Sequence, residues 1–445
     1  MIIEISTDNQ KYLQLMNQSV DNILVTGKAG TGKSTLLSQY VQTFGQENLA
    51  VLAPTGIAAL NVGGLTIHKF FGFAPHVTLQ KVTQGKFEPD KDQKQVFKKL
   101  EVIVIDEISM VRADLLDCVD MFLRMYGPNK AQAFGGVKMI FVGDMYQLPP
   151  VVKNAEKEVF MGGIYSSPYF FSAFVMADCP LKLIKLTRVY RQQDPRFISL
   201  LSNIRTNDIS NEDLRQLNQC YKPQNESSSW VTEPPINLVT TNKIADKINF
   251  DRLQAIKGTL YSYTAEISGE FSKTYYPTVE YLDYKVGAQI MLLNNDSEGR
   301  WVNGSIATIT SVGGQEKECV TARLQDSGEM CVITPYKWEI YKYLFNNGRV
   351  TTEEVGSFKQ LPFRLAWAIT IHKSQSKTFD RVLINMGSRG AFAYGQTYVA
   401  LSRCRSFEGI ELTVPIRRKD ITVDPKIVSF MASLEERYDK VTNSF

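Results

Sequence analysis

The feature that most constrains this chain is a glycine-rich octapeptide, residues 27–34, which has the fixed positions of a phosphate-binding loop at Gly27, Gly32, Lys33 and Ser34. A fully apolar run precedes it, and apolar residues recur at helical spacing after it. Strand, glycine-rich turn and helix, in that order, form the context in which such a loop folds. The segment therefore predicts an α/β layer with a nucleotide site at the end of one strand.

Short, fully apolar runs recur along the chain in two groups, and helical patterns separate them. Strands that are buried on both faces and alternate with helices indicate parallel sheets. The sequence thus predicts two α/β layers. The runs of the first group are residues 22–26, 49–53, 102–105 and 139–142, and those of the second are residues 236–240, 382–386 and 411–414.

Two stretches interrupt this rhythm and are predicted to be insertions. Residues 73–99 are rich in lysine and contain Pro75, Gly85 and Pro89. Residues 304–360 consist of short β-type runs separated by glycine and asparagine turns, which is the pattern of a small barrel. The predicted boundaries are 1–72 with 100–181 for the first α/β domain, 182–303 with 361–430 for the second, and 431–445 for a C-terminal tail.

The octapeptide has a direct chemical use. Its glycines let backbone N–H groups approach phosphates, the following helix adds positive potential, and Lys33 can reach the β- and γ-phosphates. The Ser34 hydroxyl is placed to bind Mg²⁺. A glycine-rich turn with an exposed lysine is the structural alternative. The predicted ATP-binding residues of this segment are Gly27, Gly30, Thr31, Gly32, Lys33, Ser34 and Thr35.

Acidic or amide side chains follow two of the apolar runs. Residues 102–105 lead directly into Asp106 and Glu107, and a buried strand seldom ends in adjacent acids without a cation to satisfy. Asp106 is assigned to Mg²⁺, and Glu107 to orienting or deprotonating the attacking water. Gln147, which follows the run 139–142, is placed to sense the γ-phosphate. A solvated strand end and a turn-capping amide are the respective alternatives.

Seven blocks of the sequence, in a fixed order, resemble the motifs of superfamily-one helicases. The closest resemblance is to the Pif-one family of 5′-to-3′ DNA helicases, and it extends from about residue 7 to residue 407. A set of ordered blocks is far more specific than any one of them. The blocks are residues 53–60, 66–68, 106–110, 143–150, 190–192, 366–375 and 398–403.

The resemblance implies an α/β fold of two RecA-like motor domains, with ATP in the cleft between them. It also implies a short wedge insertion and a small SH-three-like β-barrel, in agreement with the two insertions. By position, Gln10 would read the adenine edge. Arg191 and Arg403 match two arginines that the second domain offers to the γ-phosphate, and a surface ion pair is the alternative for each. The predicted catalytic residues are Lys33, Asp106, Glu107, Gln147, Arg191 and Arg403.

The same resemblance places single-stranded DNA across the tops of both motor domains. Hydroxyl, imidazole and lysine groups suit phosphate contacts, which hold a strand without reading its sequence. The aromatic run 70–73 could stack on bases or separate a duplex, although a core role is expected for at least two of its three rings. The predicted DNA-binding residues are Thr55, Thr66, His68, Phe73, Thr370, His372, Lys373 and Ser374.

One position departs from the family pattern. Ser376 follows the block 366–375, at a point where the family usually has glycine. If the backbone there needs a positive φ, serine costs about 1 kcal/mol relative to glycine. The departure therefore predicts a local loop that differs from that of other members.

Composition bounds the remaining choices. Lysine and arginine total 50 against 46 for aspartate and glutamate, and this net charge of +4 excludes a histone-like protein that binds by charge alone. Six scattered cysteines and three histidines predict neither a disulfide scaffold nor a zinc site. No run approaches the ~20 apolar residues that span a bilayer. The expected location is the cytoplasm of a bacterium or phage-infected cell, or the nucleus or mitochondrion in a eukaryote.

The leading prediction is an ATP- and Mg²⁺-dependent helicase that moves 5′ to 3′ on single-stranded DNA. It is expected to act as a monomer at junctions of single- and double-stranded DNA, in replication, repair, recombination, or telomere-type or G-quadruplex processing. Three alternatives are a small-metabolite kinase, a binding module with a vestigial ATPase, and a helicase for RNA or mixed substrates. Arg403 argues against the first and the intact Lys33 and Asp106 against the second, whereas phosphate contacts barely separate RNA from DNA.

Overall fold

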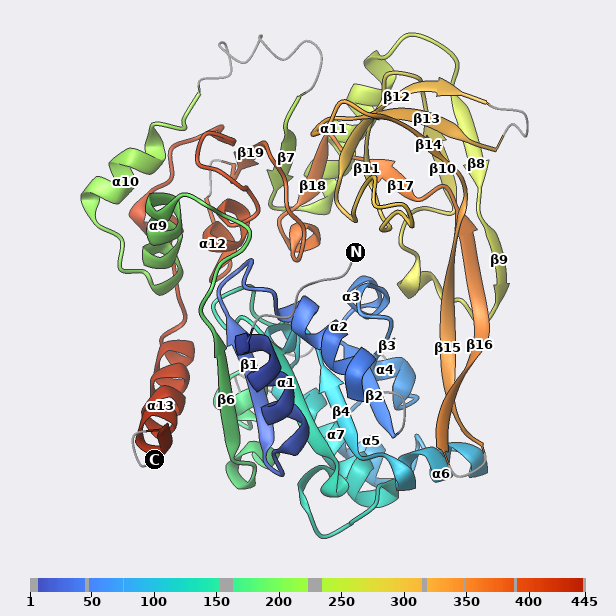
Figure 1. Cartoon of the computed structure of the whole chain (residues 1–445), viewed down its shortest axis with the longest axis vertical. Helices are drawn as coiled ribbons and strands as arrows, with labels where there is room; N and C mark the ends of the chain where they lie inside the picture. The colour runs from blue at the N-terminus through green and yellow to red at the C-terminus, as the bar shows by residue number, and fades with distance from the viewer. Residues whose placement is uncertain are drawn as a thin grey trace.

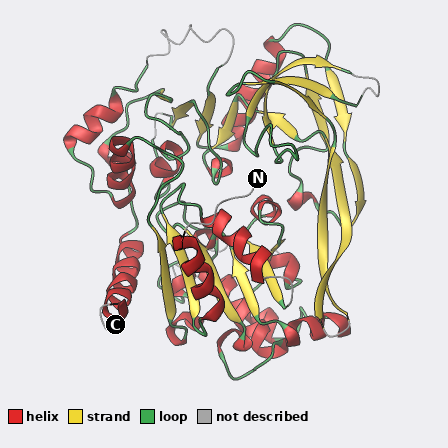
Figure 2. Ribbon diagram, viewed as in Figure 1, coloured by secondary structure: helices red, strands yellow, loops and turns green. Residues whose placement is uncertain are grey.

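The computed structural model describes residues 7–44, 48–74, 76–152, 163–222, 234–313, 318–346, 349–387 and 390–442. Two α/β layers lie one above the other in Figure 1, and a β-rich part stands beside both of them. Figure 2 shows that helices flank the lower sheet, whereas strands dominate the β-rich side. Among the described residues, no helix is long and apolar enough to cross a membrane.

The first layer is a six-stranded sheet in the order β3-β2-β4-β5-β1-β6, and all of its pairings are parallel. The four expected strands are present, while β3 and β6 were not predicted. Both lie at the edges of the sheet, where runs are shorter or more polar. The strands are β1 Asn22–Gly27, β2 Leu49–Ala53, β3 Leu65–Thr66, β4 Val102–Ile105, β5 Lys138–Gly143 and β6 Leu181–Leu186.

Helices cover both faces of this sheet, because side chains alternate along each strand. Ile23 and Val25 of β1 enter a core cluster with residues of α1 and α2. Leu24, between them, enters the large cluster on the opposite face, with Phe122 of α7. The helices are α1 Thr7–Gln18, α2 Lys33–Phe44, α3 Gly56–Asn61, α4 Ile67–Phe70, α5 Leu79–Thr83, α6 Lys91–Lys99 and α7 Ala113–Tyr126.

The second layer is a parallel sheet in the order β18-β7-β19-β20. Its three expected strands are present as β7, β19 and β20, while the edge strand β18 was not predicted. The strands are β7 Ile236–Val239, β18 Ala368–Thr370, β19 Val382–Asn385 and β20 Ile410–Leu412. The helices of this part are α9 Pro195–Thr206, α10 Asn211–Asn218, α11 Asn242–Ala255 and α12 Gln396–Leu401.

The β-rich part contains a five-stranded antiparallel sheet in the order β14-β13-β12-β11-β17. A long hairpin of β15 and β16 pairs with β9 and extends down to α6 (Figure 1). Strands of the predicted insertion therefore pair with β9 and β11, which both precede residue 304. The boundaries of the insertion stay a prediction. The strands are β8 Tyr261–Thr264, β9 Glu266–Gly269, β10 Tyr281–Tyr284, β11 Gln289–Leu292, β12 Ile306–Val312, β13 Val320–Leu324, β14 Met330–Ile333, β15 Tyr336–Asn346, β16 Arg349–Gln360 and β17 Phe363–Leu365.

The segment predicted as the wedge insertion, residues 73–99, contains α5 and α6 and lies against the long hairpin. Lys342 of the hairpin reaches Asp90 at 3.7 Å. Nearby, Lys69 of α4 forms an ion pair with Glu270 at 2.8 Å. These exposed pairs bridge the first layer to the β-rich part.

The C-terminal helix, α13 Pro425–Thr442, returns to the first layer and lies beside β6 (Figure 1). Glu435 pairs with Lys185 of β6 at 2.7 Å, and Phe430 stacks on Phe171 with ring centroids 4.1 Å apart. Most of the predicted tail, 431–445, is thus helix, and its last three residues lie outside the described residues.

Candidate active site

A cavity of about 990 Å³ lies between the two α/β layers and collects most of the predicted nucleotide-binding residues. The first layer supplies the phosphate-binding loop and the two adjacent acids, and the second supplies two arginines. The predicted residues that line the cavity are Gly30, Thr31, Gly32, Lys33, Ser34, Thr35, Asp106, Glu107, Gln147, Arg191 and Arg403. Gly27 and Gln10 are outside this lining. Gln10 is exposed on α1, and the neighbouring Asn9 lines the cavity instead.

The phosphate-binding loop joins β1 to α2 in a conformation that requires glycine. φ is +77° at Gly30 and +83° at Gly32, in the region that residues with a Cβ seldom adopt. A Cβ on Gly27 would lie 2.5 Å from the Thr31 hydroxyl oxygen. Lys33 Nζ donates to the backbone carbonyl oxygens of Gly27 at 2.8 Å and of Lys28 at 3.0 Å. Its ammonium is therefore already held over the loop.

The two acids at the end of β4 are held close together. Asp106 is buried, and this burial, with the charge of Glu107, raises the pKa of the Asp106 carboxyl to about 7. The Glu107 N–H donates to Asp106 Oδ1 at 2.9 Å. A carboxylate that is costly to ionise in this position favours a bound cation. Within the described residues, no group of three or more His, Cys, Asp or Glu could hold a metal, so phosphate oxygens and water would complete any site.

The two arginines enter the cavity from the second layer, and neither has a carboxylate partner in the part of the chain that the structure describes. Arg191 Nη1 donates to the Ser402 carbonyl oxygen at 3.0 Å, and burial, reinforced by the charge of Arg403, lowers the pKa of Arg191 to about 9. Arg403 is 1% exposed, and its Nε donates to the Val399 carbonyl oxygen at 2.9 Å. Among the described residues, neither forms an ion pair. The alternative of a surface ion pair is therefore wrong for both, and both guanidinium charges are available to an anion.

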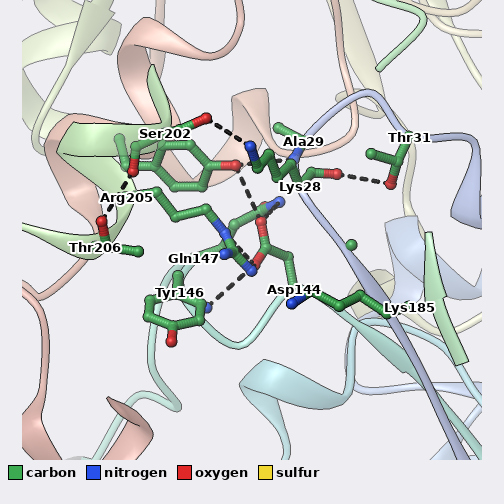
Figure 3. Close-up of polar contacts among 12 residues, drawn as sticks. Lys28, Ala29, Thr31, Asp144, Tyr146, Gln147, Lys185, Ser202, Arg205 and Thr206 are labelled. Atoms are coloured by element: carbon green, nitrogen blue, oxygen red, sulfur yellow. Dashed lines mark hydrogen bonds and ion pairs between the residues drawn. The ribbon is translucent and has the colours of Figure 1, made fainter. Parts of the chain in front are cut away.

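A buried polar network beneath the loop joins the two layers (Figure 3). Asp144, at the end of β5, is 0% exposed and forms an ion pair with Arg205 of α9 at 2.8 Å. The Tyr398 hydroxyl of α12 donates to Asp144 at 3.1 Å and accepts from the Ala29 N–H of the loop at 2.8 Å. Gln147 Nε2 donates to the same carboxylate at 3.4 Å. One carboxylate thus links the loop, Gln147 and two helices of the second layer.

The residues of the first layer that are predicted to contact single-stranded DNA lie at the ends of β2 and β3 or shortly after them. Thr55 is exposed and caps α3. Thr66 is buried, caps α4, and its hydroxyl lies 2.6 Å from that of Tyr275, which comes from the β-rich part. His68 is half-buried, and burial, together with the charge of Arg112, lowers its pKa. A neutral imidazole contacts a phosphate only as a hydrogen-bond donor. Thr55 and His68 are thus accessible to single-stranded DNA, whereas Thr66 is buried and bonded to Tyr275.

The residues of the second layer that are predicted to contact single-stranded DNA lie at the end of β18 and directly after it. Lys373 is exposed and His372 is half-buried, and burial lowers the pKa of His372. Thr370 is buried and accepts from the Lys373 N–H at 3.2 Å. Ser374 is 0% exposed and donates to the Ile371 carbonyl oxygen at 2.7 Å, so that its hydroxyl shapes the turn. In this arrangement Ser374 is not available to DNA, a correction to the predicted contact set.

Phe73 requires a second correction. Phe73 is 6% exposed, and its ring lies in an aromatic cluster with Phe71, Phe87 and Phe122. All three rings of the aromatic run 70–73 are therefore core, in agreement with the expectation of at least two. Burying an aromatic ring removes a large apolar area from water, and this outweighs exposing it for occasional stacking.

Comparison with known proteins agrees with this geometry. The family model described as PIF1-like helicase matches residues 6–215. The ATP-dependent DNA helicase Pif1 of Bdellovibrio bacteriovorus is 30% identical over 439 residues, which cover 97% of this chain and 93% of that protein. The chain belongs to the PIF1-like helicase family. The predicted family is confirmed, and so is the enzyme class, an ATP-dependent DNA helicase.

Solved PIF1-like structures confirm the predicted fold class and also separate two arrangements. Bacteroides Pif1 in complex with ADP-AlF4 superposes with a TM-score of 0.87 at 34% identity, covering 98% of both chains. The unliganded Bacteroides protein gives 0.85, covering 98% of this chain and 97% of its own. The form bound to single-stranded DNA gives 0.67 at the same 34% identity and 98% coverage of both chains. The present arrangement of parts is thus closer to those of the ADP-AlF4-bound and unliganded proteins than to that of the DNA-bound one.

Two residues at or near the cleft of this PIF1-like chain, Tyr190 and Arg205, were not predicted as site residues. Tyr190 is 52% exposed and lines the cavity. Its ring lies beside Gly32 of the loop, since a Cβ placed on Gly32 would be 3.7 Å from it. The Arg188 guanidinium lies 5.1 Å from the ring centroid. An exposed ring beside a phosphate-binding loop offers a stacking surface to a base, and its place directly before Arg191 was a usable signal. Arg205 gave none, because nothing local marks a helical arginine as buried.

Proposed function

We propose that this chain is an ATP-driven motor that moves 5′ to 3′ along single-stranded DNA and separates the strands at a junction with duplex. The observation that carries the proposal is the division of the cleft. The first layer brings Lys33 and Glu107, and the second brings Arg191 and Arg403 to the same cavity. A γ-phosphate in that cavity is surrounded only when both layers are in place, so that hydrolysis depends on their relative position.

The roles follow from the contacts. Lys33 exchanges its two loop carbonyl oxygens for phosphate oxygens, because a charged acceptor is the stronger partner. Glu107 turns its carboxylate to a water molecule and accepts a proton from it as that water attacks. The guanidinium groups of Arg191 and Arg403 stabilise the charge that develops on the transferred group. Gln147, tied to Asp144, reports the loss of the γ-phosphate to the network beneath the loop.

Mg²⁺ is part of the proposal, and the residues fit it. Asp106 is a buried carboxylate whose pKa is raised by burial and by the charge of Glu107, so that a cation beside it would be favourable. Ser34 lines the same cavity. These two residues would hold the ion. When bound, Mg²⁺ neutralises phosphate charge.

The proposed contacts with single-stranded DNA are those predicted residues that are exposed or half-buried, namely Thr55, His68, His372 and Lys373. Few of these groups are charged, so the affinity for a strand depends on hydrogen bonds to phosphates and permits movement. We expect a single chain to be active, although one solved structure concerns DNA unwinding at forked duplex DNA by two coordinating Pif1 helicases. A role in genome maintenance and a bacterial or phage-infected cytoplasm complete the proposal.

The test uses four matched duplexes, with a 5′ or a 3′ single-stranded tail and with DNA or RNA as the tailed strand. We expect ATP-dependent separation of the 5′-tailed DNA duplex and none with Lys33→Ala. Separation of only the 3′-tailed duplex would reverse the polarity. Equal activity on the RNA-tailed duplex would favour the mixed-substrate alternative, and ATP turnover that no nucleic acid stimulates would favour a small-molecule kinase.

A further inference from the structure

A serine and a glutamate from opposite sides of the cleft are joined by a hydrogen bond, and both have an unusual backbone. Ser376 Oγ donates to Glu107 Oε1 at 2.6 Å. φ is +62° at Ser376 and +49° at Glu107, the left-handed region in which a Cβ meets the following carbonyl oxygen. Such conformations persist where the surrounding structure holds them, and they gather at functional sites. The bond therefore joins two strained points.

The two residues belong to parts of the chain with different tasks. Glu107 follows β4 and leads into a short 3₁₀ helix, Ile108–Met110. Ser376 comes shortly after another, His372–Ser374, which contains proposed strand contacts. Both residues line the nucleotide cavity. A displacement of the loop 370–376 is thus transmitted to the Glu107 carboxylate through a single contact.

The conformation in which this bond is present is also informative. The chain superposes better on unliganded Bacteroides Pif1 than on the form bound to single-stranded DNA. The bond thus belongs to an arrangement of the motor that differs from the DNA-bound arrangement of that relative. Glu107 is half-buried and Ser376 is exposed, so the contact can open without unfolding its surroundings.

We infer that Ser376 is a positioning residue that restrains Glu107 and keeps ATP hydrolysis slow until a strand is bound. The inference rests on the function proposed above. Ser376 occupies one carboxylate oxygen of Glu107 and ties it to the second layer, whereas water activation requires that carboxylate to turn toward the γ-phosphate. A strand that displaces the loop 370–376 breaks the bond and frees Glu107. Ser376 thereby suppresses ATP hydrolysis that is not coupled to movement.

The test measures ATP turnover with and without single-stranded DNA in variants of the full chain. Ser376→Gly removes the hydroxyl and relieves the backbone, and Ser376→Ala removes only the hydroxyl. Both are expected to raise the DNA-independent kcat about fivefold, leaving KM for ATP and the DNA-saturated kcat within twofold. Ser376→Asn, which keeps a donor and tolerates positive φ, is expected to retain slow basal turnover. Asn207→Gly is the control, because Asn207 has φ +59° at the exposed end of α9.

The possible outcomes distinguish the hydrogen bond from backbone strain and from a direct part in catalysis. Unchanged basal turnover in both hydroxyl-free variants would overturn the inference. A rise in Ser376→Gly alone would show that strain, not the bond, is responsible, and would overturn it too. A fall in turnover with and without DNA would show that Ser376 assists catalysis instead. If wild-type turnover does not respond to DNA at all, the proposed function fails, whatever the variants do.

Discussion

The two α/β layers are built alike but contribute opposite chemistry to the cleft. The first offers backbone N–H groups, Lys33 and the acids Asp106 and Glu107, all positioned by the ends of its own strands. The second offers the guanidinium groups of Arg191 and Arg403, which lack carboxylate partners in the described part of the chain. In the function proposed above, the first layer binds the phosphates, and the second supplies the charge that makes the site hydrolytic.

This division explains why a motor needs both layers. In this proposal a nucleotide binds to the first layer alone, and its γ-phosphate is stabilised only where the second layer approaches. The buried Asp144–Arg205 pair and the Tyr398 hydroxyl hold the layers in register beneath the loop. The predictions that follow remove one contribution at a time, from the largest expected effect to the smallest.

Removing a guanidinium should separate hydrolysis from binding. Arg191→Ala and Arg403→Ala are each expected to lower the DNA-stimulated kcat by roughly 10³-fold, the usual contribution of an arginine at the γ-phosphate. ATP affinity should change by only a few fold, because the first layer is untouched. Arg215→Ala is the control, since Arg215 is an exposed residue paired with Glu212. Loss of ATP binding in step with turnover would contradict the division.

Breaking the pair that joins the layers should destabilise the whole protein. Arg205→Met leaves the Asp144 carboxylate buried without its cation, at a cost of about 3–5 kcal/mol, and should lower the Tm by roughly 10 °C. The double variant Arg205→Met with Asp144→Leu should recover part of this loss. Thermal unfolding of both variants checks the prediction, and an unchanged Tm would show that the pair is not what holds the layers.

The pH dependence of this pair has a definite sign. Burial raises the pKa of Asp144, but the charges of Arg205 and Lys33 outweigh it, and the pKa lies below its usual value. The folded protein therefore binds this proton less readily than the unfolded chain does. The stabilising contribution is present above about pH 4 and is lost as the pH falls further. In Arg205→Met, burial without this cation raises the pKa of Asp144, so that acid protonates the carboxyl and relieves the cost of burying its charge. The Tm difference between wild type and Arg205→Met should accordingly narrow as the pH falls toward 4 and below.

The exposed ring of Tyr190 tests how the cavity holds the base of a nucleotide. Tyr190→Ala should raise KM for ATP about tenfold, in line with ~1–3 kcal/mol for stacking a base on an aromatic ring. Tyr190→Phe should leave it nearly unchanged, since the ring is kept. An equal effect of the two substitutions would show that the hydroxyl, and not stacking, matters.

The smallest effect concerns Lys377, a buried lysine next to Ser376. Burial, with the charge of Arg364, lowers the pKa of Lys377 to about 7, and its Nζ donates to Asn303 Oδ1 at 2.6 Å. Between pH 7 and about 10.4, the unfolded chain binds this proton and the folded one does not, so stability from this group rises with pH. Lys377→Met should therefore raise the Tm most near pH 7 and progressively less toward pH 9.5. The exposed Lys419→Met should show no such trend.

The sequence predicted those parts of the site whose meaning is local. The loop at residues 27–34 and the acids after β4 each require a short stretch in a fixed context, and the structure brings them to one cavity. The expected strands of both sheets were located within one or two residues, because strands buried on both faces are nearly continuous apolar runs.

What the sequence did not predict depends on contacts between distant segments. Arg205 and Asp144 are 61 residues apart, and only the packing of α9 on the end of β5 makes them a buried pair. The hydroxyl of Thr66 meets Tyr275 from the β-rich part. Phe73 and Ser374 belong to predicted strand-binding segments, but the core and a local turn take their side chains. Residue type and order could not show whether each of these side chains would contact DNA or the rest of the protein.

The division of labour between the layers is tested most directly by steady-state ATP turnover of the wild-type chain, titrated with single-stranded DNA. In this account the second layer completes the γ-phosphate site, and bound single-stranded DNA controls how closely that layer approaches the first. The kcat should therefore rise at least tenfold at saturating DNA, and Arg403→Ala should abolish that rise. Turnover that is already maximal without DNA, or a DNA-stimulated rate that survives the loss of Arg403, would contradict it.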